Sequence, residues 1–172
     1  MGYTKSLAII TGASQGIGRA TALRLARDFS AIVLVARDKD NLETTAAEVM
    51  SLGAEASASA LVRQPQSAKS IIEGTLERFG RIDALLNIAG AVPQIDLFEM
   101  TDAQWDGGMA LNLNGARQAS KGSVVFMSGS AAFAPKPGYA AVAAINAAIN
   151  ALAEAFAEQG IKDGVQVNLE RL

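Results

Sequence analysis

The chain has 172 residues, half of them apolar, with 15 Lys and Arg against 17 Asp and Glu. A chain of this size can bury a substantial core as one soluble globular domain. It contains neither cysteine nor histidine, which excludes disulfides and thiolate chemistry and removes the commonest general base and metal ligand.

The charge pattern and hydropathy also restrict the partners. The formal net charge is -2 and no run of Lys and Arg forms a stripe, so the electrostatic term that drives nucleic-acid binding is missing. We find no apolar stretch of the roughly 18 residues that a membrane span needs. We therefore expect a cytoplasmic protein with neither nucleic acid nor membrane as a partner, and no metal site.

Short β-branched runs alternate along the chain with segments of helical spacing. We predict strands over residues 7–10, 31–35, 54–60, 82–86, 124–127 and 165–167, and helices over 18–29, 41–52, 67–79, 101–112 and 139–159. The strand over 54–60 is assigned mainly because the alternation requires one. Gly53, Gly80 and Gly160 are predicted to end helices in a left-handed conformation. The alternation predicts an α/β fold, a doubly wound parallel sheet of the Rossmann type, as a single domain over residues 1–172.

A glycine-rich loop follows the first predicted strand, with the sequence Thr11-Gly12-Ala13-Ser14-Gln15-Gly16-Ile17-Gly18. We interpret it as a phosphate-binding turn. Gly12 permits a tight turn, Gly16 lets the backbone approach a pyrophosphate, and Gly18 lets the helix pack on the strand. The helix N-terminus adds free N–H groups and a positive dipole. The alternative is an ordinary glycine-rich connection between a strand and a helix.

A second motif, Asn87-Ile88-Ala89-Gly90, ends the strand predicted to lie beside this loop. With these two segments the chain resembles the short-chain dehydrogenase/reductase family, whose cofactor motifs are Thr-Gly-x-x-x-Gly-x-Gly and Asn-Asn-Ala-Gly. Ile88 replaces the second Asn. The resemblance continues through Trp105-Asp106, Asn112-Leu113-x-Gly115, residues 122–128 and residues 165–168.

The resemblance implies a bound nicotinamide dinucleotide. The strand over 31–35 leads into Ala36-Arg37. Ala36 occupies the position where NAD-users of the family tend to carry Asp, and Arg37 follows it as in many NADP-users, so we predict NADP, with NAD as the alternative. Arg37 as a solvated charge paired with Asp38 or Asp40 is the other interpretation. Leu61-Val62 stands where the family usually places an Asp against the adenine. The predicted cofactor-binding residues are Gly12, Ser14, Gln15, Gly16, Ile17, Gly18, Arg37, Val62, Asn87, Ala89 and Gly90.

The family's proton relay is largely missing. It consists of a Tyr, a Lys four residues later that lowers the pKa of that Tyr from about 10, a Ser that holds the substrate oxygen, and an Asn. Asn112 matches the Asn. Aligned without gaps, residues 142–149 put Val142 at the Tyr position and Asn146 at the Lys position, and Gly129 falls at the Ser position. We therefore predict no catalytic residue.

Two nearby groups leave an alternative open. Ser128 and Ser130 flank the Ser position, and Tyr139 with Lys136 precedes the aligned helix. Sliding that helix by three residues would turn its apolar face by about 60° away from the sheet. We therefore interpret Tyr139 as a rim residue and Lys136 as a solvated turn residue.

Two segments are short for the family. Nine residues, 113–121, separate Asn112 from Gly122, enough for about 13 Å of helix. The chain ends at Leu172, where relatives continue into a Pro-Gly turn, a substrate lid and a last strand. We expect either a sheet truncated at its C-terminal edge or a longer natural chain. The Ala-rich helix over 140–158 corresponds to one that pairs with its copy in this family, which implies a homo-oligomer, a dimer or a tetramer.

The sequence therefore predicts an NADP(H)-binding oxidoreductase that acts on a small molecule by hydride transfer between carbonyl and alcohol but lacks the usual Tyr and Lys. The rival hypothesis is a non-catalytic dinucleotide-binding or subunit-interface protein. A third is a damaged fragment that binds nothing.

Overall fold

A computed structural model describes residues 6–60, 67–90, 101–103 and 122–171. The chain divides into two compact units, Met1–Ala89 and Gly90–Leu172. Strands alternate with helices in both, and the strand pairs described within each unit are parallel. The predicted α/β class with a doubly wound parallel sheet is confirmed. The extent of the domain, 1–172, stays a prediction.

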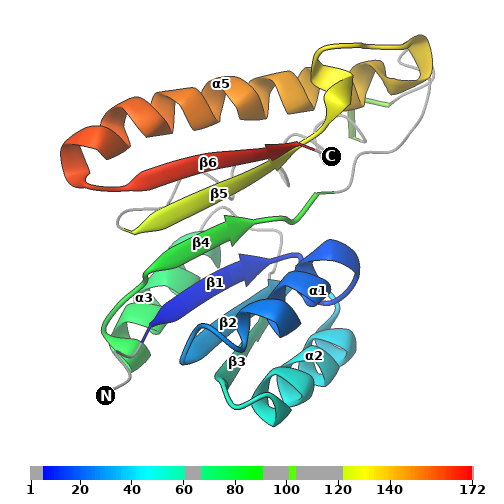
Figure 1. Cartoon of the computed structure of the whole chain (residues 1–172). Coiled ribbons are helices and arrows are strands. Elements are labelled where there is room, and N and C mark those ends of the chain that lie inside the picture. The colour runs from blue at the N-terminus through cyan, green and yellow to red at the C-terminus, as the bar shows by residue number, and fades with distance from the viewer. Residues whose placement is uncertain (1–5, 61–66, 91–100, 104–121, 172) are drawn as a thin grey trace. The chain divides into compact units, whose positions relative to one another are not determined.

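The first unit carries four strands in the order β3-β2-β1-β4 (Figure 1). Its strands are β1 (Leu7–Thr11), β2 (Ala31–Ala36), β3 (Glu55–Ala60) and β4 (Ala84–Asn87), and its helices are α1 (Gly16–Leu25), α2 (Lys39–Ser51) and α3 (Ser67–Phe79). All four strands were predicted, although β4 begins two residues later than expected. The helix predicted over 18–29 instead covers 16–25.

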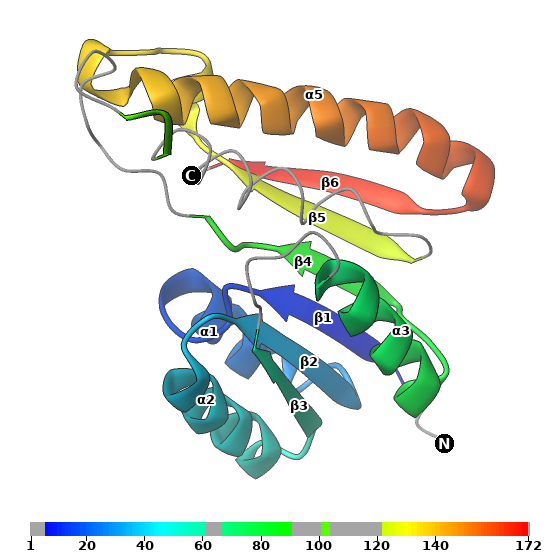
Figure 2. The ribbon, with the colours of Figure 1, turned by 180° about the vertical axis from the view of Figure 1, so that it is seen from behind.

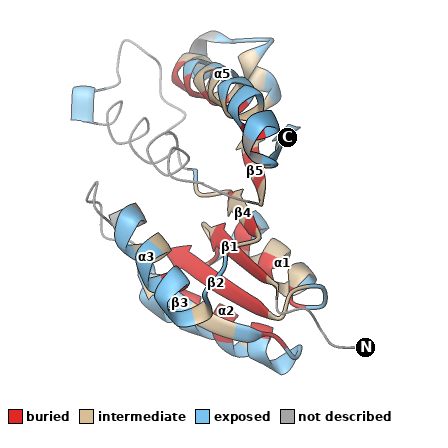
Figure 3. Cartoon of the chain, turned by 90° about the vertical axis from the view of Figure 1, so that its left-hand side faces the viewer, coloured by how far each residue is buried: buried red, intermediate tan, exposed pale blue. Residues whose placement is uncertain are grey.

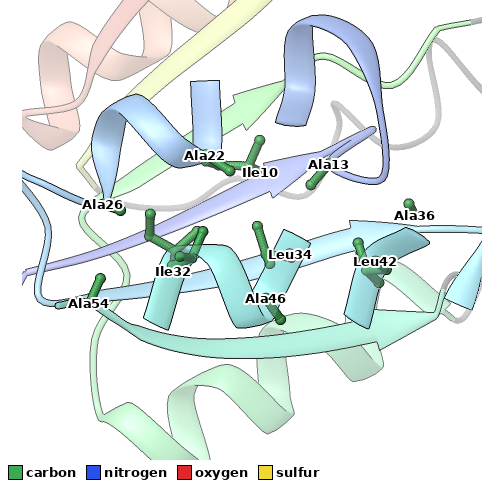
Figure 4. Close-up of a cluster of buried hydrophobic side chains, with 11 residues drawn as sticks. Ile10, Ala13, Ala22, Ala26, Ile32, Leu34, Ala36, Leu42, Ala46 and Ala54 are labelled. Carbon is green, nitrogen blue, oxygen red and sulfur yellow. The ribbon is translucent and has the colours of Figure 1, made fainter. Parts of the chain in front are cut away.

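Helices cover both faces of this sheet. Ile10, Ile32 and Leu34 belong to a core cluster with side chains of α1 and α2 (Figure 4). Leu7, Ile9, Ala31, Val33 and Val35 point the other way, toward α3, which lies in front of the sheet in Figure 2. Both faces are buried, as the burial colours of Figure 3 show, and β2 is apolar throughout, whereas β1 is apolar up to Ile10 and ends in Thr11.

The second unit contains the parallel pair β5 (Ser123–Ser128) and β6 (Gln166–Arg171) and the long helix α5 (Ala140–Asp163). Two 3-10 turns, η3 (Ser130–Ala132) and η4 (Pro137–Tyr139), connect β5 to α5. The rings of Phe126 in β5 and Phe156 in α5 lie 5.7 Å apart. The helix predicted over 101–112 lies outside the described residues apart from 101–103.

The prediction for Gly160 is wrong. Gly53 and Gly80 do follow their helices with positive φ, at 98° and 74°. Gly160 instead lies inside α5, which continues to Asp163, and Gly164 with φ 70° ends it. A Cβ on Gly160 would lie 2.7 Å from the carbonyl oxygen of Val165. Glycine is therefore needed there for the close approach of the chain that returns toward β6, not for a helix end.

The expectation that no segment reaches the length of a membrane span is also wrong. Residues Ala140–Lys162 of α5 form a helix that is long and apolar enough to cross a membrane, with a mean hydropathy of 1.5. Core helices of soluble proteins can be equally long and apolar, and Ala141, Ile145 and Ile149 of α5 are buried. Length and composition alone are therefore weak evidence for a membrane.

Asp83 joins the starts of β1 and β4. Its Oδ2 accepts a hydrogen bond from the Leu7 N–H at 2.8 Å, and its own N–H donates to the Leu7 carbonyl at 2.9 Å. The Arg81 guanidinium donates to both carboxylate oxygens, at 2.8 and 2.6 Å. The bond from Arg81 is the main cause that lowers the pKa of the Asp83 carboxyl, the Leu7 N–H lowers it further, and burial opposes both.

We expect Asp83→Asn to lower the free energy of unfolding at pH 7 by about 0.5 to 1 kcal/mol, a small value because solvent screens this pair. A lowered pKa stabilises the fold above the ordinary Asp value of about 3.9, and this stabilisation disappears as the pH falls through the folded-state pKa. Urea unfolding at several pH values from 7 to 3 measures the difference, which should shrink toward the acid end. Glu77→Gln on exposed α3 is the control. A difference independent of pH would contradict the assignment.

Candidate functional site

The loop between β1 and α1 has the geometry of an anion site. Gly12 and Gly16 have positive φ, 71° and 55°. Gln15, the residue before α1, is extended and provides no side-chain cap. The first backbone bond of the helix runs from the Arg19 N–H to the Gln15 carbonyl at 3.2 Å. The N–H groups of residues 16–18 precede that bond and point out of the helix end, so they suit a phosphate.

The three glycines of this loop have different roles. A Cβ on Gly16 would meet nothing within 4 Å, so the space in front of it is open. A Cβ on Gly18 would lie 2.2 Å from the Gly12 carbonyl oxygen. Gly18 thus lets α1 approach the Gly12 turn itself. A Cβ on Gly12 would lie 3.0 Å from the backbone N and Cα of Ala89, so Gly12 also admits the second motif.

The Thr11 side chain connects the two motifs. Its Oγ1 accepts hydrogen bonds from the N–H groups of Ile88 and Ala89, both at 3.0 Å. The same hydroxyl lies 3.1 Å from Oδ1 of Asn87, to which it can donate. Asn87 is only 5% exposed. Sequence reasoning quoted Thr11 in the motif but did not include it among the site residues; the signal available was a hydroxyl at the end of a strand beside Gly12.

Ile88, which departs from the family pattern, still takes part in this arrangement. The group that binds Thr11 is its backbone N–H, which any residue but proline supplies. Its side chain packs against the core cluster of β1, β2, α1 and α2. The replacement of Asn by Ile therefore leaves the junction of the two motifs intact.

Arg37 follows the last residue of β2 and is exposed. The Asp38 carboxylate is occupied as the cap of α2, where it accepts from the Asn41 backbone N–H at 3.0 Å and its side-chain amide at 2.7 Å. Within the described part of the chain, Arg37 forms no ion pair with Asp38 or Asp40. Its guanidinium is available to a ligand, and its role toward a 2′-phosphate stays a prediction.

The other predicted cofactor residues are distributed as follows. Gln15 and Ile17 are exposed on the loop and Ser14 is half-buried in it. Gly90 is the first residue of the second unit, and Val62 lies outside the described residues. So do Trp105, Asp106, Asn112, Leu113 and Gly115, on which part of the family resemblance depends. Among the residues that the structure describes, no group of three acidic side chains could hold a metal ion.

The positions aligned with the proton relay belong to the second unit. Gly129 directly follows β5, with φ −142° and ψ 158°, a conformation open to any residue. Val142 and Asn146 lie one turn apart on α5, and both are half-buried. The Ser128 hydroxyl donates to the Asn146 carbonyl at 3.3 Å. The structure thus brings the end of β5 against this turn of α5.

Tyr139 and Lys136 lie in the turns before α5. The Tyr139 N–H donates to the Lys136 carbonyl at 2.9 Å. Both side chains are exposed. These contacts agree with a rim position for Tyr139 but do not test whether it serves as a proton donor.

The comparisons with known proteins point to one family. The family model described as short chain dehydrogenase matches residues 6–170. The short-chain reductase protein NovJ of Streptomyces niveus is 36% identical over 117 residues, which cover 67% of this chain and 45% of that protein. A 3-oxoacyl-[acyl-carrier-protein] reductase of Synechocystis is 37% identical over 120 residues, 69% of this chain and 49% of that protein. The matches thus span about half the length of these relatives.

Solved structures agree with this result. A metagenomic short-chain oxidoreductase in complex with NADP has a TM-score of 0.90 and 30% identity, and the match covers 97% of this chain and 81% of that one. NAD+-bound xylitol dehydrogenase has a TM-score of 0.88 and 27% identity, with 98% and 70% covered. Because the family model extends across both units, from the glycine loop to the end of β6, the chain belongs to the short-chain dehydrogenase family.

Proposed function

We propose that this chain is an NADP(H)-binding oxidoreductase of the short-chain dehydrogenase type that works without the usual Tyr and Lys. The observation that carries the proposal is the loop at Gly16. Its front is open, the end of α1 is uncapped, and Thr11 joins the loop to the second motif. An open turn with free N–H donors at a helix N-terminus suits the pyrophosphate of a dinucleotide.

Arg37 supports NADP over NAD. At the end of β2, Ala36 is apolar and the Asp38 carboxylate already accepts two hydrogen bonds from Asn41 as the cap of α2. The Arg37 cation, which has no ion-pair partner in the described part of the chain, suits a 2′-phosphate. Related structures contain either nucleotide, NADP in one and NAD+ in another. The choice for this chain therefore rests on Arg37, with NAD as the alternative.

The chemistry we propose is slow reduction of a small carbonyl compound or oxidation of an alcohol. A bound nicotinamide dinucleotide supplies or accepts the hydride. Neither Val142 nor Gly129 has a group that transfers a proton, and the Asn146 amide carries no charge that could lower the pKa of a hydroxyl. The Ser128 hydroxyl is already bonded to α5. Tyr139 is the first other hydroxyl to test as a proton donor.

These substitutions also favour a second candidate function, a non-catalytic dinucleotide-binding or subunit-interface protein. We further propose a cytoplasmic homo-oligomer formed through α5, as a dimer or a tetramer. Exposed small residues of α5 follow one another at intervals of three or four positions, at Ala144, Ala147, Ala151 and Ala155. Small side chains at this spacing permit close packing of two helices, and the family resemblance supports the same face.

We expect Gly16→Val to abolish NADPH binding, which should be micromolar to sub-millimolar in the wild type by analogy with intact family loops. The new side chain would fill the open space before the loop, and a Val disfavours the positive φ at this site. Fluorescence titration measures the dissociation constant. Gly53→Val is the matched control, because Gly53 also has positive φ and open surroundings but ends α2. Equal binding by wild type and Gly16→Val would remove the loop from the site.

Arg37→Asp should weaken NADPH binding more than NADH binding, and we expect the ratio of the two dissociation constants to change by about tenfold or more. The substitution removes a charge-assisted contact to the 2′-phosphate and offers an acceptor to a ribose hydroxyl. Arg27→Asp, an equal charge change after α1, is the control. An unchanged ratio would show that Arg37 does not discriminate between NADPH and NADH.

Wild-type turnover of ketones and aldehydes with NADPH should stay below about 1 s⁻¹. We expect the triple variant Gly129→Ser, Val142→Tyr, Asn146→Lys to turn over about 10² to 10⁴ times faster, since a positioned general acid contributes this much. NADPH absorbance follows the reaction. The control carries Phe instead of Tyr at position 142 and so lacks only the hydroxyl. Faster wild-type turnover would identify another proton donor, with Tyr139 tested first. No gain by the triple variant, with NADPH bound, would favour the non-catalytic function.

A further inference from the structure

The carboxyl ends of β5 and β6 place Arg171 next to Ser128. Three register pairs alternate along these strands, Val124 with Val167, Phe126 with Leu169, and Ser128 with Arg171. Partners in a parallel pair point to the same face of the sheet, and every second residue shares that face. Phe126 contacts Phe156 of α5 and Ser128 bonds the Asn146 carbonyl. Arg171 therefore leaves its strand on the face that α5 covers.

Phe133, the residue after η3, holds the Arg171 side chain. The guanidinium carbon lies 4.7 Å from the centroid of the Phe133 ring. Phe133 is 61% exposed, so its contact with Arg171 lies at the protein surface. A cation over an aromatic face is attracted by the ring and restricted in orientation. The contact places the Arg171 guanidinium at the Phe133 ring, at the carboxyl end of β6.

The Arg171 guanidinium has no anionic partner in the described part of the chain. The ion pairs there join other residues. Glu170, the neighbour of Arg171 in β6, points to the opposite face because side chains alternate along a strand. A planar guanidinium without an ion-pair partner among the described residues matches the two oxygens of a carboxylate.

The position of this cation suggests what it binds. Open parallel sheets bind ligands beyond the carboxyl ends of their strands, and Arg171 and Ser128 are the last residues of β6 and β5. The turn of α5 that contacts Ser128 carries Asn146, which is neutral, whereas Arg171 supplies a positive charge at the end of β6. We propose that Arg171, oriented by Phe133, is a substrate-binding residue for a carboxylate. This inference rests on the proposed function and makes oxo acids, with their hydroxy-acid products, the substrate class.

The test compares levulinate, a small oxo acid, with its uncharged methyl ester by ligand-observed NMR on the full chain, with and without NADPH. Arg171→Met keeps the apolar stem against Phe133 but removes the charge, and Arg171→Lys keeps the charge but lacks the paired N–H donors of the guanidinium. We expect Arg171→Met to raise the levulinate dissociation constant at least about tenfold, as loss of a charge-assisted bond does. The dissociation constant of Arg171→Lys should lie between those of the wild type and Arg171→Met. Binding of the ester should not change. Lys162→Met, a charge removed at the other end of α5, is the control.

A second variant tests the contact with Phe133 in case Arg171→Met disturbs the fold. Phe133→Leu removes the aromatic face at an exposed position and should weaken levulinate binding by a smaller factor than Arg171→Met. Equal levulinate binding by wild type and Arg171→Met overturns the inference, as does equal affinity for levulinate and its ester. Inorganic phosphate that displaces levulinate at the same concentration, or NADPH binding that weakens in Arg171→Met while levulinate binding does not, also overturns it.

The same titrations separate this inference from the proposed function. If levulinate binds through Arg171 but the wild type does not bind NADPH, the carboxylate site stands and the oxidoreductase proposal fails. If NADPH binds but the binding of levulinate does not depend on Arg171, the proposed dinucleotide site stands and the carboxylate site fails.

Discussion

The Thr11 hydroxyl joins the ends of two neighbouring strands, and the candidate cofactor site of the first unit depends on that junction. It accepts from two successive backbone N–H groups, those of Ile88 and Ala89, at 3.0 Å. Gly12 beside it has no side chain, which lets Ala89 approach to a distance at which a Cβ would be crowded, 3.0 Å from the Ala89 backbone. Each bond contributes about 1 kcal/mol, but their main effect is geometric, because they hold the second motif against the glycine loop.

The packing of the sheet brings the loop to that junction. Because both faces of β1 and β2 are buried, their carboxyl ends open at an edge where only loops and helix ends remain. Gly18 lets α1 begin directly against the Gly12 turn. The Arg19 side chain of α1 then bonds Glu48 of α2 at 2.7 Å, a tie between the two helices that sequence reasoning missed. The uncapped end of α1 and the end of β2 before Arg37 are positioned by these contacts.

The second unit distributes charge differently from what the family resemblance implies. The resemblance places a cation on α5, where this chain has Asn146. The structure has a cation at the end of β6 instead, stacked on Phe133. Ser128, one of the two serines that flank the position aligned with the family's Ser, is bonded to the backbone of α5. In our proposal, the Arg171 cation binds an acidic substrate and takes no part in proton transfer.

The sequence by itself determined the alternation of strands and helices and most of the glycine turns. β-branched runs buried on both faces identify β1 and β2, and the glycines at positions 12, 16, 53 and 80 have the positive φ that such turns need, because backbone preference is set by the residue and its near neighbours. Only the tertiary structure decided that Gly160 lies inside α5 against Val165, that Thr11 binds the second motif, and that Arg171 lies beside Ser128. These contacts join residues that strand register and helix packing bring together, and neither leaves a local signal in the chain.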